Sequence, residues 1–146
     1  MLWRLTAIFV CAASLAACSK ASQTSSTASP NNGASPSAKM ASANGASVYV
    51  QNCSSCHGSG GKGQPGAFPP LSGNPVVTGA PTNVIHIVKA GLTGPIKVKG
   101  QSYNGQMPSW SGILNNDQIA AVVTYIRSSW GNKAGAVTSG QVAAAK

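Results

Sequence analysis

Two cysteines and a histidine stand within five residues of one another in the segment CSSCH, at Cys53, Cys56 and His57. A glycine-rich and proline-containing stretch, GSGGKGQPG, follows directly. Thiolate sulfur and imidazole nitrogen bind soft metal ions, and paired thiols also form disulfides or react with cofactors. The segment therefore predicts redox, metal or cofactor chemistry.

The histidine directly after the second cysteine separates these alternatives. A plain disulfide gives His57 no role, and a thioredoxin-like pair belongs at a strand-to-helix junction, whereas this pair ends an apparent helix. A zinc site needs further Cys or His ligands, and His86 is the one candidate left unassigned. The spacing C-x-x-C-H is that of covalent c-type haem attachment. We therefore predict one covalent haem c, bonded to Cys53 and Cys56 and ligated at its iron by His57.

An iron atom ligated by His57 has a second axial position. Met107 lies in the loop-like segment YNGQMPSW, where its thioether can be presented without helical constraint. A methionine that merely fills a gap in the core is the ordinary alternative. The rival ligand is His86, but its segment PTNVIHIVKAG predicts a short buried helix, in which a histidine is more often packed and hydrogen-bonded. We predict Met107 as the second axial ligand.

These motifs resemble those of class I monohaem cytochromes c. The likeness consists of C-x-x-C-H, of P-x-L at Pro69 and Leu71, and of the M-P dipeptide at Met107, and it covers residues 45–132. It is closest to cytochrome c domains of proteobacterial respiratory chains and of membrane alcohol dehydrogenase cytochrome subunits, although the latter usually carry three haem motifs. The resemblance implies that the Pro69 carbonyl, or that of the next proline, accepts a hydrogen bond from His57.

The resemblance also implies the fold class. We expect an all-α class I cytochrome c fold of about three to five helices around the haem, joined by Gly- and Pro-rich loops. Leu71 would pack on the haem, and Tyr103 and Trp110 could donate hydrogen bonds to its propionates. Aromatic packing is an equal alternative for both rings. No β-sheet is needed, and the segment GLTGPIKVKGQSYNG is expected to be an irregular loop.

The first helix expected from the sequence covers residues 45–53 and ends at the cysteines, with Ser42 or Asn44 as its cap. Gly45 and Tyr49 lie four residues apart on one face of it. By the family likeness, this face crosses the C-terminal helix, where a glycine permits close backbone approach.

The last long helix has the clearest signal in the chain. Asn115 and Gln118 form a capping-box pattern ahead of apolar residues at helical spacing. The same pattern recurs at Thr138 and favours a short helix over residues 139–145, within a C-terminal tail at 134–146.

The N-terminus resembles an export signal. Arg4 precedes an apolar run that is shorter than the roughly 20 residues needed to cross a bilayer. The sequence LAAC, ending at Cys18, resembles the lipobox of bacterial lipoproteins, in which cleavage falls before a cysteine that is then lipidated. We predict a signal peptide over residues 1–17 and a lipid on Cys18, with an ordinary signal cleavage as the alternative.

Residues 18–42 are almost entirely small or polar and bury too little apolar surface to fold alone. We predict a lipid-anchored flexible tether there, followed by one cytochrome c domain over residues 43–133. The domain would then lie on the periplasmic side of a bacterial membrane.

The chain is strongly basic, with ten Lys and Arg, one acidic residue and a net charge of +9. The acid, Asp117, is explained by its place in the first turn of the last long helix. Dispersed lysines and export from the cytoplasm both disfavour nucleic acid as a partner. A basic face that steers the domain toward acidic redox partners or an anionic membrane surface fits better.

The inventory of side chains predicts an electron carrier and not an enzyme. Acid-base catalysis needs paired titratable groups, and this sequence supplies few. We expect a membrane-tethered cytochrome c that shuttles single electrons from a dehydrogenase or a bc-type complex to a terminal oxidase. The alternatives are a cytochrome subunit of a multi-chain oxidoreductase, and a haem-based small-molecule sensor or peroxidase.

Overall fold

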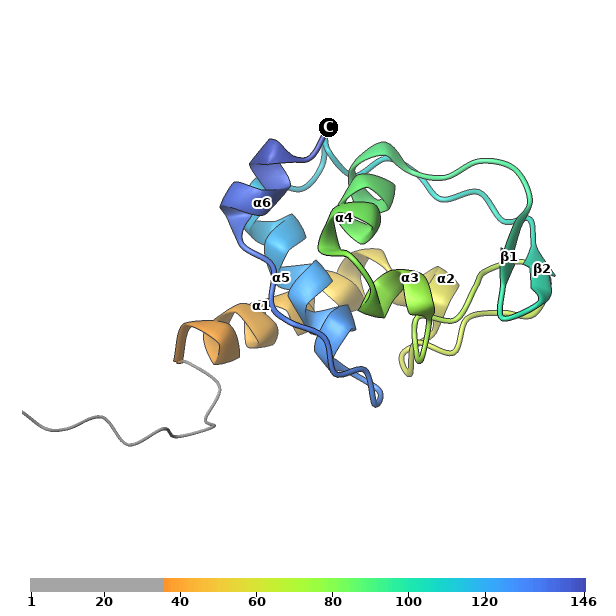
Figure 1. The fold of residues 1–146 in the computed structure, drawn as a ribbon, viewed down its shortest axis with the longest axis horizontal. Coiled ribbons are helices and arrows are strands. Elements are labelled where there is room, and N and C mark those ends of the chain that lie inside the picture. The colour runs from red at the N-terminus through yellow and green to blue at the C-terminus, as the bar shows by residue number, and fades with distance from the viewer. Residues whose placement is uncertain (1–35) are drawn as a thin grey trace, which may run out of the picture. The chain divides into compact units, whose positions relative to one another are not determined.

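The structure is a computed structural model that describes residues 36–146, with side chains from residue 44 onward. The expected signal peptide, Cys18 and most of the expected tether lie outside these residues. The described part is mostly helical, with one small hairpin (Figure 1). The helices are α1 (Pro36–Asn52), α2 (Ser54–His57), α3 (Pro75–Thr78), α4 (Pro81–Ala90), α5 (Asn116–Ser128) and α6 (Ser139–Ala144), and the strands are β1 (Ile96–Val98) and β2 (Gln101–Tyr103).

The helix α1 begins earlier than expected. It starts at Pro36 and not near Gly45, so neither Ser42 nor Asn44 is its cap. Proline is well tolerated in a first helical turn, and the alanine, lysine and methionine residues that follow have high helix propensity. Residues that are too polar to form a core alone can therefore still extend a helix whose later turns pack against the rest of the domain.

The expected crossing of the first and last long helices is confirmed. The helices α1 and α5 pack against each other, and a methyl group on Gly45 would overlap the carbonyl oxygen of Ala121. The ring of Tyr49 lies 5.5 Å from that of Tyr125 and 4.9 Å from that of Trp130, measured between centroids. Glycine is thus required here because the two backbones touch.

The predicted cap of α5 is also confirmed. The backbone N–H of Gln118 donates to Oδ1 of Asn115 at 2.9 Å, and the backbone N–H of Asn115 donates to Oε1 of Gln118 at 3.0 Å. Asp117 lies in the first turn, as expected, where a negative charge favours the helix dipole.

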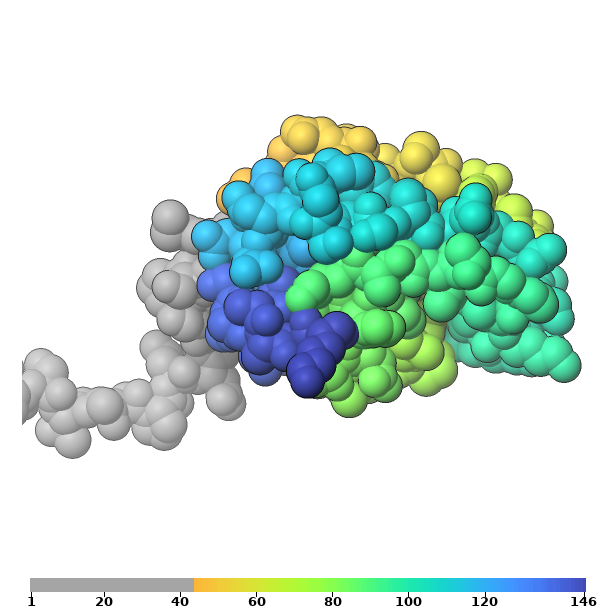
Figure 2. Space-filling view, turned by 90° about the horizontal axis from the view of Figure 1, so that it is seen from above, coloured from red at the N-terminus to blue at the C-terminus, as the bar shows by residue number. Residues whose placement is uncertain are grey.

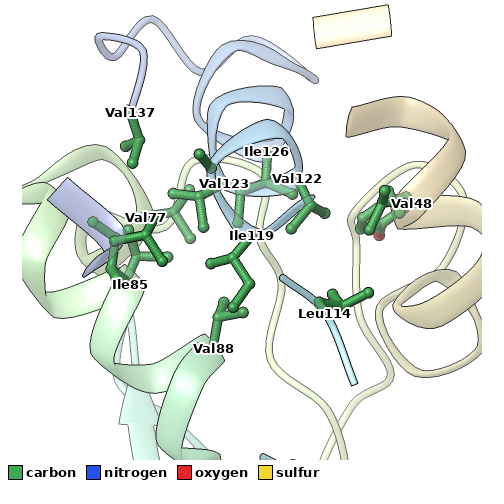
Figure 3. Close-up of a cluster of buried hydrophobic side chains, with 14 residues drawn as sticks. Val48, Val77, Ile85, Val88, Leu114, Ile119, Val122, Val123, Ile126 and Val137 are labelled. Carbon is green, nitrogen blue, oxygen red and sulfur yellow. The ribbon is translucent and has the colours of Figure 1, made fainter. Parts of the chain in front are cut away.

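The core lies where α5 meets α3 and α4. Figure 3 shows side chains from these helices directed toward one another, among them Val77, Ile85 and Val123. Ile85 and Val123 are fully buried. The short buried helix expected around His86 is thus confirmed as α4, with its apolar face on α5.

The segment expected to be an irregular loop contains an antiparallel hairpin instead. Ile96 pairs with Tyr103, and Val98 pairs with Gln101. The turn residues Lys99 and Gly100 both have positive φ, at 50° and 81°. A two-residue turn of this kind matches the right-handed twist of the strands, so the hairpin closes. The expectation that the fold has no sheet was therefore wrong.

The C-terminal tail carries the short helix that the capping pattern predicts, α6, and this helix lies against α4 and α5. Figure 2 shows the dark blue end of the chain beside the green α4. Val142 is fully buried, and the Lys89 ammonium donates to the carbonyl oxygens of Val142, at 3.1 Å, and Ala145. A cation at the C-terminal end of a helix stabilises carbonyl groups that have no partner within the helix.

Within residues 36–146, no helix is both long enough and apolar enough to cross a membrane.

Candidate cofactor site

A cavity of about 300 Å³ opens between the helices and the hairpin, and most of its lining is apolar. Its walls come from α1, α2, α3, α4 and α5, from β1, and from the two loops that carry Pro69 and Met107. The sequence-predicted site residues that line it are Cys53, Cys56, His57, Pro69, Leu71, Met107 and Trp110. Two thiols, an imidazole and a thioether thus face one apolar space.

The cysteine pair is placed by the junction between α1 and α2. The Cys53 N–H donates to the Tyr49 carbonyl at 2.9 Å, which continues α1, and the His57 N–H donates to the Cys53 carbonyl at 3.0 Å. One helical turn therefore carries Cys53, Cys56 and His57 to the cavity wall. Burial, followed by the neighbouring Cys56, raises the pKa of the Cys53 thiol to about 11. Before any covalent attachment, burial thus favours the thiol of Cys53 over the thiolate.

His57 is buried and held by one hydrogen bond. Its Nδ1 lies 3.0 Å from the Pro69 carbonyl oxygen, and a carbonyl oxygen can only accept, so Nδ1 carries the proton. Burial lowers the pKa of His57, and this hydrogen bond partly opposes the effect. The neutral ring has its Nε2 lone pair left to bind a metal ion.

The loop between residues 61 and 72 brings Pro69 to His57. The Gly63 N–H donates to the His57 carbonyl at 2.8 Å, and the Leu71 N–H donates to the Gly61 carbonyl at 2.8 Å. These bonds fold the loop back on the cysteine segment, so that Pro69 and Leu71 line the cavity.

Met107 reaches the cavity from the loop between β2 and α5, far along the chain from Cys53 and His57. Its N–H and carbonyl both pair with Leu92, at 2.9 Å each, in an isolated antiparallel bridge. The bridge requires a close approach at Gly91, where φ is 78° and a methyl group would come within 2.6 Å of the Met107 carbonyl oxygen. The thioether is thus carried by a loop fixed at its backbone.

His86 does not line the cavity. It is exposed on α4, and its Nδ1 lies 2.7 Å from the backbone oxygen of Lys146. His86, which was both the rival axial ligand and the candidate further zinc ligand, is therefore directed to the C-terminal tail and away from Cys53 and His57.

The two predicted aromatic residues differ in position. Trp110 lines the cavity, and its backbone N–H donates to the Val88 carbonyl at 3.1 Å. Tyr103 is buried at 9 % exposure and is not among the residues that line the cavity, although its strand partner Ile96 does line it. Opposed residues of an antiparallel pair share one face of the hairpin, so Tyr103 lies on the face of Ile96, and its contact with the propionates stays a prediction.

The sequence analysis missed one wall of the cavity. Ile96 and Val98 on β1 line it, together with the buried Asn74 that caps α3. The alternation of Ile96 and Val98 ahead of a Lys-Gly turn was the available signal for this wall.

A mostly helical domain with two thiols, an imidazole and a thioether around one apolar cavity defines a haem-binding class of protein. The sequence pattern of the family "Cytochrome c" matches residues 42–130, and the chain belongs to the cytochrome c family. The family implies covalently bound haem c, and the helical fold agrees with the expected class I fold.

Known relatives agree with this assignment. The chain is 42 % identical over 97 residues to "Cytochrome c-552" of Thermus thermophilus, covering 64 % of this chain and 64 % of that one. It is 44 % identical over 108 residues to "Alcohol dehydrogenase (quinone), cytochrome c subunit" of Gluconacetobacter polyoxogenes, covering 73 % of this chain and 23 % of that one. It is 36 % identical over 95 residues to a "Cbb3-type cytochrome c oxidase subunit FixP" of Rhizobium etli, covering 64 % of this chain and 31 % of that one. The match spans just under two thirds of the first relative and about a quarter of the second.

The donor set fits the cofactor that the family implies. Thiols at C-x-x-C spacing supply two covalent attachment points, and an imidazole with a free Nε2 supplies an axial nitrogen. A thioether supplies an axial sulfur, and the apolar lining suits a flat apolar ring. The residues present therefore match haem c in number and chemistry.

Proposed function

We propose that this protein is an electron carrier, a cytochrome c with one haem that transfers single electrons between protein partners and catalyses no reaction on a substrate. The observation that supports this most is the convergence of Cys53, Cys56, His57 and Met107 on one apolar cavity. When bound, the haem iron supplies a one-electron couple between its ferric and ferrous states.

The chain's own residues would hold and tune that couple. Cys53 and Cys56 would form the covalent attachments, and His57 and Met107 would ligate the iron. The Pro69 carbonyl fixes the orientation of the His57 ring and increases its basicity. An apolar wall with Leu71 and Val98 excludes water, which disfavours the more highly charged ferric state and favours a high reduction potential.

An oxidised and a reduced optical spectrum of the mature protein, together with its intact mass, tests the proposal. We expect a covalent haem increment in the mass, a low-spin ferrous spectrum and the sulfur-to-iron band of methionine ligation in the ferric state. A mass without that increment would refute the proposal.

A second candidate function is a cytochrome subunit of a multi-chain oxidoreductase. The names of the relatives favour it, because they include cytochrome c subunits of an alcohol dehydrogenase and of a cbb3-type oxidase. Purification under mild conditions distinguishes the two functions. A carrier is recovered alone, whereas a subunit is recovered with a catalytic chain in fixed ratio.

The cellular arrangement is part of the same proposal. Residues 1–17 would be removed as a signal peptide, Cys18 would carry lipid, and residues 18–42 would link the lipid to the domain at 43–133 and its tail at 134–146. The domain would lie on the periplasmic side of a bacterial membrane and reach a dehydrogenase, a bc-type complex or a terminal oxidase through a basic face. In a Cys18→Ala variant, haem-containing protein should move from the membrane fraction to the soluble periplasmic fraction. Retention in the membrane would refute the lipid anchor alone.

A further inference from the structure

Two consecutive prolines, Pro69 and Pro70, lie in the loop that carries the hydrogen-bond acceptor of His57. Neither proline has a backbone N–H, so hydrogen bonds can hold this pair only through its two carbonyl oxygens. The Pro69 carbonyl accepts from Nδ1 of His57 at 3.0 Å, and the Pro70 carbonyl accepts from Nδ2 of Asn74 at 2.8 Å. Within residues 44–146, no other hydrogen bond reaches either carbonyl.

The ring of Pro70 links these two hydrogen bonds. The Pro69 carbonyl belongs to the planar peptide group before the Pro70 Cα, and the Pro70 carbonyl belongs to the peptide group after it. Rotation about φ and ψ would turn one group relative to the other, but a proline ring fixes φ at about −65°. The angle ψ remains, and the bond from Asn74 restrains the group that ψ turns. That bond therefore also restrains the direction of the Pro69 carbonyl.

Asn74 is itself firmly held. The residue is only 4 % exposed, and its Oδ1 accepts from the Val76 N–H at 2.9 Å at the start of α3. Its backbone N–H donates to the Leu71 carbonyl at 3.4 Å, and its carbonyl accepts from the Thr78 N–H at 3.0 Å. The amide that bonds Pro70 is thus fixed to a helix terminus.

The cap of α3 alone does not explain an asparagine at position 74. Serine and aspartate cap helices about as well as asparagine. An ionised aspartate has no donor, and serine has one donor on a shorter side chain, whereas the amide of asparagine has an acceptor and two donors. Burial of an amide also costs free energy unless its polar groups are bonded. The bond to Pro70 accounts for both the residue type and its burial.

We propose that Asn74 is a positioning residue for the axial ligand His57, and that it acts through Pro70 and the Pro69 carbonyl. The inference rests on the proposed haem-binding function and deepens it. By holding the Pro69 carbonyl beside Nδ1, Asn74 maintains the orientation and the basicity of the imidazole that would ligate the iron.

The loop does not depend on Asn74 for its overall course. The Leu71 N–H donates to the Gly61 carbonyl at 2.8 Å, and the buried side chain of Asn132 donates to the Leu71 carbonyl at 3.0 Å. Both contacts remain when Asn74 is changed. Loss of the bond to Pro70 should therefore free the proline pair without unfolding the loop.

The test uses the holoprotein with nitrogen-15-labelled histidine. Asn74→Ser keeps an acceptor for the α3 cap and removes the donor to Pro70. Asn115→Ser is the matched control, because it makes the same change at the cap of α5, outside the cavity wall. NMR of the reduced protein follows exchange of the His57 Nδ1 proton with deuterium, and a redox titration measures the potential.

We expect the His57 Nδ1 proton to exchange about fivefold faster in Asn74→Ser than in the control, which corresponds to the loss of one ordinary hydrogen bond. The reduction potential should rise, because a weaker bond to Pro69 makes the imidazole a poorer donor to ferric iron. The sulfur-to-iron band of Met107 should be unchanged, because a separate bridge to Leu92 holds that loop. Equal exchange rates, a fall in potential or loss of the band would each overturn the inference.

Pro70→Ala tests the route of the effect. Without the ring φ is free, so the bond from Asn74 no longer restrains the Pro69 carbonyl. In the Pro70→Ala background, Asn74→Ser should accelerate exchange by less than about twofold, because two changes on one route are not additive. The same acceleration in both backgrounds would show that Asn74 does not act through the proline ring, and would overturn the inference.

Intact mass and optical spectra of the same samples separate this inference from the proposed function. A covalently attached and ligated haem with unchanged exchange overturns the role of Asn74 and leaves the carrier function standing. A wild-type mass without haem refutes the carrier function, and this inference with it.

Discussion

The Nδ1 atom of His57 and the carbonyl oxygen of Pro69 lie 3.0 Å apart. Because a carbonyl can only accept, this contact assigns the proton to Nδ1 of the buried ring. The Nε2 lone pair is therefore left to bind a metal ion. The contact also joins the cysteine segment to the loop over residues 61–72. One hydrogen bond thus couples the position of an axial ligand to a surface loop.

Met107→Ala should open the second axial position. We expect the sulfur-to-iron band to disappear, carbon monoxide to bind the ferrous protein rapidly and the reduction potential to fall, because a thioether ligand raises the potential. Optical spectra and a redox titration measure all three. The matched control is His86→Ala, whose side chain bonds Lys146 outside the cavity and should leave spectrum and potential unchanged. A normal spectrum in Met107→Ala would assign the ligand elsewhere.

A chain that cannot attach haem should lose its cooperative fold. Cys53→Ser with Cys56→Ser leaves the cavity of about 300 Å³ without its occupant. At about 24 cal/mol per Å³, an empty cavity of that size costs on the order of 7 kcal/mol, comparable to the roughly 5–15 kcal/mol that stabilises an ordinary domain. Thermal unfolding followed by circular dichroism should therefore show a broad, weak transition. A sharp transition near that of the holoprotein would contradict this account.

Tyr49→Phe should have a pH-dependent effect on stability. The Tyr49 hydroxyl donates to the Gly58 carbonyl at 2.6 Å, and burial raises its pKa above the ordinary value. The neutral phenol is therefore favoured in the folded state, so its contribution is fully present below the unfolded-state pKa of about 10 and is lost as the pH rises further. We expect the variant to lose about 1 kcal/mol of unfolding free energy at neutral pH.

Denaturant unfolding of the holoprotein on both sides of pH 10, about the pKa of a free phenol, measures this effect. The difference between wild type and Tyr49→Phe should shrink at the higher pH. A difference that stays constant would show that Tyr49 does not ionise in either state over that range.

Gly45→Ala should destabilise the crossing of α1 and α5. The added methyl group would overlap the Ala121 carbonyl and come within 2.8 Å of the Tyr125 Cβ, and neither backbone can move freely. Overpacking of this kind costs about 1–3 kcal/mol, or roughly 4–8 °C in Tm for each kcal/mol in a domain of this size. Gly112→Ala is the control, since a methyl group there meets open space. Equal melting temperatures for the two variants would contradict the close approach.

Local signals in the sequence predicted the long helix α5 and the tail helix α6 well. Both depend on a capping box, in which two residues three apart satisfy each other's backbone donors, so the sequence contains the whole interaction. The start of α1 was missed, because a helix that is held by packing at one end can extend into residues of weak amphipathic pattern.

The residues of the candidate site also fall into two groups, those that the sequence identified and those that it did not. Cys53, Cys56 and His57 are contiguous, so a short motif identifies them, and Met107 follows from the scarcity of other sulfur ligands. The wall formed by Ile96 and Val98 depends on a hairpin whose turn has two residues at positive φ, one of them a lysine. Positive φ is unusual for lysine, and the sequence alone gave little reason to expect it.

Asp117 is the only side-chain carboxylate in the sequence, and it serves a helix terminus and no ion pair of the core. Proteins unfold in acid mainly because native carboxylates must take up protons. Here the buried Arg127 is held by carbonyl oxygens, which do not titrate. Acid therefore has one side-chain carboxylate to neutralise, and the group that it must charge against burial is His57, whose pKa is lowered. We expect acid unfolding to follow the protonation of this one imidazole, and not the loss of ion pairs.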